Sequence, residues 1–170
     1  MKKVLAGVIL TMTAASVSAA NYYAPSDNLI GGLSYVSLSE DDVDVTVGAL
    51  VGSIASQHNV TDQFSLVPEL RLGAGVKDDK VVLGEVKLEY FAAISVKAQL
   101  DVTDSFYVYA SPSYAYRSLE ASSGIDIGSD SDFGIGAGAG FEFYPGVAAE
   151  LSYERFSNFG VASFGLKFPM

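Results

Sequence analysis

Residues 85–101 alternate between apolar and polar side chains over their whole length. The even-numbered positions are all apolar: Val86, Leu88, Tyr90, Ala92, Ile94, Val96, Ala98 and Leu100. Most of the odd-numbered positions are charged or polar. Successive side chains of an extended chain point to opposite faces, so the pattern predicts a single β-strand. A helix is excluded because, at about 100° per residue, the charged residues would spread over more than half of its circumference.

This strand is long enough to cross a lipid bilayer. A tilted transmembrane strand needs roughly 9–11 residues, whereas most strands of globular proteins have about 5–6. One face is apolar from end to end, and the other carries ions of both signs. A strand of a transmembrane β-barrel has this character, with lipid on the outside and a polar lumen inside. We therefore expect the even-numbered row to face lipid.

The N-terminus has the pattern of an export signal. Positive charges at Lys2 and Lys3 precede the apolar stretch 4–12 and the small residues of 14–20. The pattern predicts a signal peptide over residues 1–20, cleaved after Ala19 or Ala20. The apolar stretch is shorter than the roughly 20 residues that a membrane-spanning helix needs. No later segment is apolar enough for such a helix, so residues 21–170, a single domain, would enter a membrane as a barrel.

Composition excludes several classes of function. The chain has no cysteine, which excludes disulfides, thiol catalysis and thiolate metal sites. The net charge is −10, whereas proteins that bind nucleic acid present basic stripes. The 17 glycines, 10 tyrosines and 10 phenylalanines suit a barrel with small lumen residues and aromatic girdles.

Alternation elsewhere predicts eight strands in all. They cover 29–38, 43–55, 64–76, 85–101, 105–117 and 132–143, with a seventh from 147 and an eighth after a link at 157–158. Pro68 lies within the third strand, and because proline lacks a ladder N–H we expect a local bulge there. The glycines of 134–140 alternate within the sixth strand, and we expect them to make room for Tyr107 and Tyr109. The prediction is an all-β, eight-stranded antiparallel up-and-down transmembrane barrel.

The connections between strands differ in kind. Those after the second, fourth and sixth strands are compact, and two of them repeat Val-Thr-Asp 42 positions apart, at 60 and 102. Those after the first, third and fifth strands are acidic, and the longest is 118–131. Outer-membrane barrels have short periplasmic turns and longer outer loops, so we assign the acidic tips to the cell exterior.

With these features the chain resembles the small eight-stranded outer-membrane β-barrels of Gram-negative bacteria, the opacity-porin-like, OmpA-type and OmpX-type domains. The residues that carry the likeness are 61–69 (TDQFSLVPE), 88–91 (LEYF), 102–109 (VTDSFYVY), 133–154 and 164–168 (FGLKF). The resemblance implies location in the outer membrane, contact with lipid and lipopolysaccharide, and insertion by the barrel-assembly machinery. Family members commonly end on an aromatic residue that this machinery reads. Here Pro169 and Met170 follow Phe168, which displaces the signal by two residues.

The inward rows of the predicted strands collect charges of both signs. They are Glu69, Arg71, Glu85, Lys87, Glu89, Lys97, Arg117, Glu142, Glu150, Glu154 and Lys167. A barrel of eight strands is filled by its own side chains, and an unpaired buried charge is very costly. We expect an ion-pair network that fills and orders the lumen. The alternative is a gate whose pairs exchange, with Arg71 and Arg117 as switching members because guanidinium pairs bidentately with carboxylates.

The outward rows and the loop tips complete the set of candidate residues. The lipid-facing candidates are Leu88, Tyr90, Ile94, Val96, Phe133, Ile135 and Phe164, with Tyr114, Tyr116, Tyr153 and Phe159 expected at the outer interface. Weak candidates for a divalent-cation site shared with lipopolysaccharide phosphates are Asp41, Asp42, Asp78 and Asp79. They match no EF-hand spacing, so we expect a solvated surface, no metal site and no cofactor.

Catalysis has little support. The single histidine, His58, lies in a compact turn near Asp62, and no nucleophile accompanies it. The preferred hypothesis is a monomeric, non-enzymatic outer-membrane barrel with a structural or surface-interaction role. Two alternatives stay open: a narrow porin-like channel for ions or small solutes, and a soluble periplasmic barrel that binds an apolar ligand.

One substitution tests the predicted facing of the fourth strand. Ile94→Lys places a charge on the row assigned to lipid and should lower the free energy of unfolding by roughly 2–4 kcal/mol. Ser95→Lys lies on the inner row, where its effect on the free energy of unfolding should depend on how the lysine packs in the lumen. Comparable unfolding shifts for the two variants would contradict the assignment.

Overall fold

The computed structural model describes residues 28–40, 45–77, 79–81, 84–121 and 126–170. The predicted signal peptide lies outside these residues. The strands are β1 (Leu29–Glu40), β2 (Val45–Ser56), β3 (His58–Asn59), β4 (Phe64–Lys77), β5 (Asp79–Val81), β6 (Gly84–Thr103), β7 (Phe106–Ala121), β8 (Asp126–Tyr144), β9 (Val147–Phe156) and β10 (Phe159–Pro169). In the part of the chain that the structure describes, no helix combines the length and apolarity needed to span a membrane.

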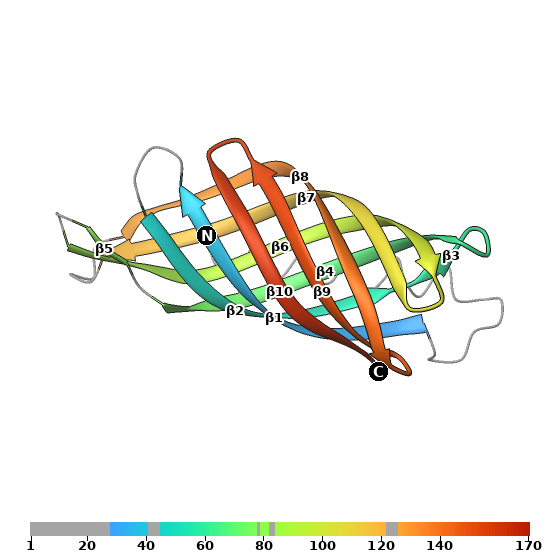
Figure 1. Ribbon diagram of the computed structural model, residues 1–170. Coiled ribbons are helices and arrows are strands. Elements are labelled where there is room, and N and C mark those ends of the chain that lie inside the picture. The colour runs from blue at the N-terminus through green and yellow to red at the C-terminus, as the bar shows by residue number, and fades with distance from the viewer. Residues whose placement is uncertain (1–27, 41–44, 78, 82–83, 122–125) are drawn as a thin grey trace.

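Eight long strands form a closed barrel (Figure 1). All neighbours are antiparallel, β1 pairs with both β2 and β10, and β4 pairs with β6. The short strands β3 and β5 extend the ladder at opposite ends, on β4 and β6 respectively. The predicted all-β, eight-stranded antiparallel barrel is therefore confirmed, and the pairing of β1 with β10 closes it.

The connections divide the barrel into two ends. The turn end holds the connections at 57–63, 104–105 and 145–146, together with the start of β1 and the end of β10. Among the described residues, the connection at 157–158 lies at the opposite end, here called the loop end. Each Val-Thr-Asp repeat closes in the same way, because Thr61 Oγ1 accepts a 3.0 Å hydrogen bond from the Phe64 N–H and Thr103 Oγ1 accepts one from the Phe106 N–H. The third turn uses Gly146 at a φ of 75°, which favours glycine.

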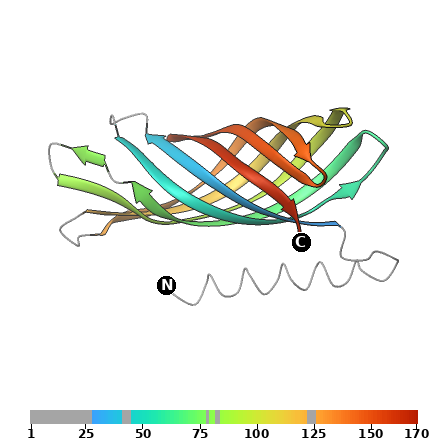
Figure 2. The same cartoon turned by 60° about the horizontal axis from the view of Figure 1, so that its bottom comes forward.

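The wall of the barrel is uneven in height. β6 and β8 have 20 and 19 residues, whereas β9 and β10 have 10 and 11. β6, β7 and β8 therefore project beyond the β9–β10 hairpin at the loop end (Figures 1 and 2). The prediction of a long connection over 118–131 is wrong, since β7 and β8 pair as far as Glu120 and Asp126. Once the barrel has fixed the register of a hairpin, polar residues extend its ladder readily.

The predicted facing holds along most strands. Phe133, Ile135 and Phe164 are 63%, 64% and 59% exposed on the outside, and Tyr90 and Val96 also lie on the outer row. Ile94 is half-buried on the same row.

Leu88 and Phe159, both predicted to lie on the outside, are instead buried inside the barrel at 3% and 1% exposure. The cause at Leu88 is a β-bulge between Leu88 and Tyr90, which reverses the facing of the residues before it. Glu89 is consequently exposed rather than inward.

The lumen of the loop-end half is filled by apolar side chains, here called the apolar cluster. Its members are Val36, Leu38, Val47, Ala49, Val51, Leu88, Phe91, Ala93, Ala115, Phe156, Phe159 and Val161, all at most 3% exposed. The rings of Phe156 and Phe159 stack with centroids 4.5 Å apart at the hairpin that joins β9 to β10. On β2 the valine row thus points inward, while Leu50 and Ile54 point outward.

Pro68 causes no bulge. It pairs with Val96 of β6 in an unbroken register. On its other side, the β2–β4 pairing ends at Glu69 and resumes as β3–β4 at Leu66. The prediction of a bulge is therefore wrong, because the missing N–H falls where the neighbouring ladder is already interrupted.

The chain has no tryptophan, so single tryptophans can report the facing of β6. We expect lipids brominated along their acyl chains to quench the fluorescence of Val96→Trp several-fold more than that of Phe91→Trp, because only position 96 contacts lipid. Leu88→Trp should behave like Phe91→Trp. Equal quenching of Leu88→Trp and Val96→Trp would contradict the bulge.

Candidate functional site

Four charged side chains form a ring across the middle of the lumen. The Lys97 ammonium lies 3.2 Å from Glu69 and 2.7 Å from Glu150. The Lys167 ammonium contacts the same two carboxylates, closely at Glu69 and at 3.8 Å at Glu150. We call this arrangement the lysine–glutamate ring. It connects the β4–β6 wall to the β9–β10 wall on the other side of the barrel.

Arg71 and Glu154 form a second cross-barrel contact. Two guanidinium nitrogens donate to the two carboxylate oxygens at 2.5 and 2.9 Å. The Ser113 hydroxyl donates a further hydrogen bond of 2.8 Å to Glu154. Glu154 is 2% exposed, so this bidentate pair is fully inside the barrel. It joins β4 to β9, which are not neighbours in the sheet.

Two tyrosines of β7 support the ring. The Tyr107 hydroxyl donates to Glu150 at 2.9 Å, and the Lys97 ammonium lies 4.5 Å from the centroid of the Tyr109 ring. A Cβ at Gly138 or Gly140 would overlap these tyrosine rings. The glycine row of β8 therefore makes the room that the sequence predicted for Tyr107 and Tyr109.

The charges of the ring and of the bidentate pair balance. Glu69, Glu150 and Glu154 face Arg71, Lys97 and Lys167, three anions against three cations. Removing ions from water is costly unless the partners satisfy one another. The arrangement acts as a neutral brace between opposite walls. Within the described residues, no group of acidic or histidine side chains has the geometry to hold a metal ion.

The structure brings together six of the predicted lumen charges, and three other described ones lie apart from this cluster. Arg117 is buried, with its guanidinium carbon 4.2 Å above the centroid of the Phe159 ring. Glu142 is exposed at the turn end, where it accepts a 3.2 Å hydrogen bond from the Gly146 N–H. Glu89, displaced by the bulge, accepts a 3.1 Å hydrogen bond from Ser118. For Glu89 the prediction of a lumen position is thus wrong, whereas Glu142 lines the open turn end of the lumen.

Some candidates fall outside what the structure describes. These are Asp41, Asp42 and Asp78, and the side chains of Asp79, Glu85 and Lys87. His58 lies on β3 and is exposed.

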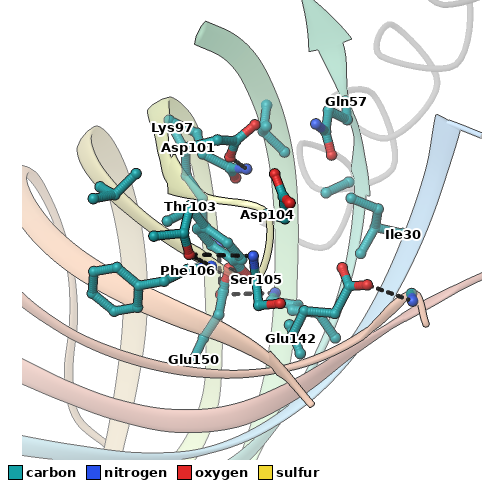
Figure 3. Close-up of a pocket in the computed structure, with 18 of the residues that line it drawn as sticks. Ile30, Gln57, Lys97, Asp101, Thr103, Asp104, Ser105, Phe106, Glu142 and Glu150 are labelled. Carbon is teal, nitrogen blue, oxygen red and sulfur yellow. Dashed lines mark hydrogen bonds and ion pairs between the residues drawn. The ribbon is translucent and has the colours of Figure 1, made fainter. Parts of the chain in front are cut away.

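A cavity of about 470 Å³ opens at the turn end, here called the vestibule (Figure 3). Its mouth carries the carboxylates of Asp62, Asp101, Asp104 and Glu142, and it reaches Lys97, Glu150 and Lys167 of the ring. Sequence reasoning missed the vestibule and the apolar cluster. The valine row of 43–51 was a signal for the cluster. Alternation alone did not decide whether this row faces the lumen or the outside of the barrel.

Comparisons with known proteins agree with this geometry. The model of the family described as "Outer membrane protein beta-barrel domain" matches residues 5–166. Neisserial surface protein A (NspA) is similar in structure, with a TM-score of 0.54 and 13% identity, over 88% of this chain and 100% of that chain. Ail, the attachment invasion locus protein of Yersinia pestis, has a TM-score of 0.52 and 13% identity, over 82% and 93%. At these identities the likeness shows the fold alone. No curated protein is significantly similar in sequence.

Breaking the bidentate pair should destabilise the barrel strongly. Glu154→Gln removes the carboxylate that pairs bidentately with the buried Arg71 guanidinium and leaves one uncompensated positive charge in the lumen, which should lower the free energy of unfolding by about 3–5 kcal/mol. The double variant Arg71→Met/Glu154→Leu removes both charges and should lower the free energy of unfolding by less than Glu154→Gln does. Urea unfolding of the folded barrel measures both effects.

Glu142→Gln is the matched control, because Glu142 is exposed at the turn end and should change stability by at most about 0.5 kcal/mol. If Glu154→Gln were as mild as this control, the pair would not brace the barrel.

Proposed function

The chain belongs to the outer membrane protein β-barrel domain family, and from that premise we propose that it is a non-conducting barrel with a structural or surface-interaction role. The observation that carries the proposal is the filled lumen. The apolar cluster occupies the loop-end half, and the ring with the Arg71–Glu154 pair occupies the middle. Few ions could pass such a lumen without the side chains rearranging.

The outer surface supports integration into the outer membrane. Large apolar side chains such as Phe133, Ile135, Leu151 and Phe164 are each about 60% exposed on the outer face. A soluble barrel that binds an apolar ligand would place this character inside, whereas the middle of this lumen is ionic. We therefore prefer membrane lipid, including lipopolysaccharide, as the environment of the barrel wall.

The loop end is the face we assign to surface interaction. Short turns face the periplasm in outer-membrane barrels, so the projecting β6–β8 wall would stand on the cell exterior. The name of Ail refers to attachment and invasion, but the likeness to Ail is one of fold. In this proposal the barrel inserts through the barrel-assembly machinery, works as a monomer and has no enzymatic activity.

A narrow channel is the second candidate, and the vestibule favours it. Solvent can enter about 470 Å³ of the lumen from the turn end and reach the ring. A gate would then require the Arg71–Glu154 pair to open, with the apolar cluster moving aside. This would break two buried hydrogen bonds of 2.5 and 2.9 Å.

Planar-bilayer recording of the purified barrel separates the two candidates. We expect no discrete conductance steps from the native protein, because the lumen is filled. Steps whose size or frequency changes in Arg71→Ala would support a gated channel and overturn the non-conducting role. Steps that are indifferent to Arg71→Ala would exclude this gate.

A further inference from the structure

A second, smaller cavity lies beyond the ring. It measures about 30 Å³, lies between the ring and the Arg71–Glu154 pair, and is here called the inner chamber. Three buried polar atoms that line it have no hydrogen-bond partner: Arg71 Nε, Ser95 Oγ and Ser163 Oγ. The three atoms are themselves inaccessible to solvent, so bulk solvent does not satisfy them.

The chamber suits ordered water. A buried water needs about 10–15 Å³ of such space and two to four polar partners. The chamber has the volume for two waters, and its lining adds the hydroxyls of Ser34, Ser111 and Ser152 to the three unpartnered atoms. A buried polar group without a partner costs about 1–3 kcal/mol, so hydration of the chamber is favourable.

The ring separates the chamber from the vestibule. Lys97, Glu150 and Lys167 line both cavities, so a single layer of side chains lies between them. On the other side of the chamber the apolar cluster begins. The inward row of β6 passes through every level in order: Gln99 in the vestibule, Lys97 in the ring, Ser95 in the chamber and Ala93 in the cluster.

The mouth of the vestibule is negative. Its carboxylates come from the turns and strand ends at Asp62, Asp101, Asp104 and Glu142. The cations among the described lining residues are Lys97 and Lys167, and both are paired with carboxylates in the ring. A cleft lined by one sign of charge concentrates ions of the opposite sign.

We propose that the lumen is a blind well, entered from the turn end. Its acidic mouth admits small cations in preference to anions as far as the ring, its inner chamber holds ordered water, and the apolar cluster seals it from the loop end. This goes beyond the proposed surface role, since it assigns the vestibule an electrostatic preference and the lumen a defined depth of hydration.

Cysteine substitution tests the depth, because the native chain has no thiol. Gln99→Cys should react with methanethiosulfonate reagents, whereas Ala93→Cys and Val161→Cys should react at least a hundred-fold more slowly in the folded barrel. Ala93 and Val161 are 3% and 0% exposed, and both replacements are close in size to the native residue. Labelling of either cluster position within ten-fold of Gln99→Cys would overturn the seal.

The same Gln99→Cys thiol tests the charge of the mouth. With rates normalised to a free thiol in solution, an ammonium reagent should react at least ten-fold faster than a sulfonate reagent. Asp62→Asn/Asp104→Asn should reduce that ratio several-fold, and so should high salt. A ratio near one in the native background would overturn cation preference.

Water cross-peaks in NMR spectra test the chamber directly. The amide protons of Ser95 and Ser163 should show contacts to long-lived water, and those of Ala93 and Val161 should show none. Ser95→Val fills the chamber and should remove the contact at Ser163. Absence of water contacts at both serines in the native barrel would overturn the hydrated chamber.

Discussion

Six ionised side chains in the lumen must be neutralised by one another, and this requirement shapes the barrel. The Lys97–Glu150, Lys167–Glu69 and Arg71–Glu154 contacts form only when β4 and β6 face β9 and β10 across a closed sheet. An open sheet would lose these three cross-barrel contacts, and a closed barrel without them would hold buried charges that lack full compensation. Closure and charge pairing therefore stabilise each other, and a chain without disulfides depends on that coupling.

The lumen is layered along its axis, and each layer has its own chemistry. The vestibule is solvated and acidic at its mouth, the ring and bidentate pair are ionic, and the loop-end half is apolar. The apolar layer keeps water away from the Arg71–Glu154 pair on one side, which strengthens its electrostatic interaction. A barrel built in this way presents different surfaces at its two ends. The β6–β8 wall projects at the loop end, and the acidic mouth of the vestibule opens at the turn end.

Much of the fold follows from alternation alone, because a two-residue period fixes strand identity and the apolar outer row fixes which face the lumen occupies. The inward positions of Glu69, Arg71, Lys97, Glu150 and Glu154 were predictable for this reason. Leu88 and Glu89 were not, since a bulge leaves no mark in the hydrophobic pattern. The inward valine row of β2 was not predictable, because its opposite row combines Thr46 and two glycines with Leu50 and Ile54, so neither row is marked as the lumen face. The pairing of specific charges depends on barrel register, which the sequence does not encode locally.

Nitrogen-15 NMR of the lysine side chains in the folded barrel tests the central claim, that paired charges fill the middle of the lumen. The account predicts two ammonium resonances protected from exchange with water, lost one at a time in Lys97→Met and Lys167→Met, while the remaining lysines exchange rapidly. If every lysine ammonium exchanged at the rate of a solvent-exposed side chain, the lumen would be open and hydrated throughout, and the account would be wrong.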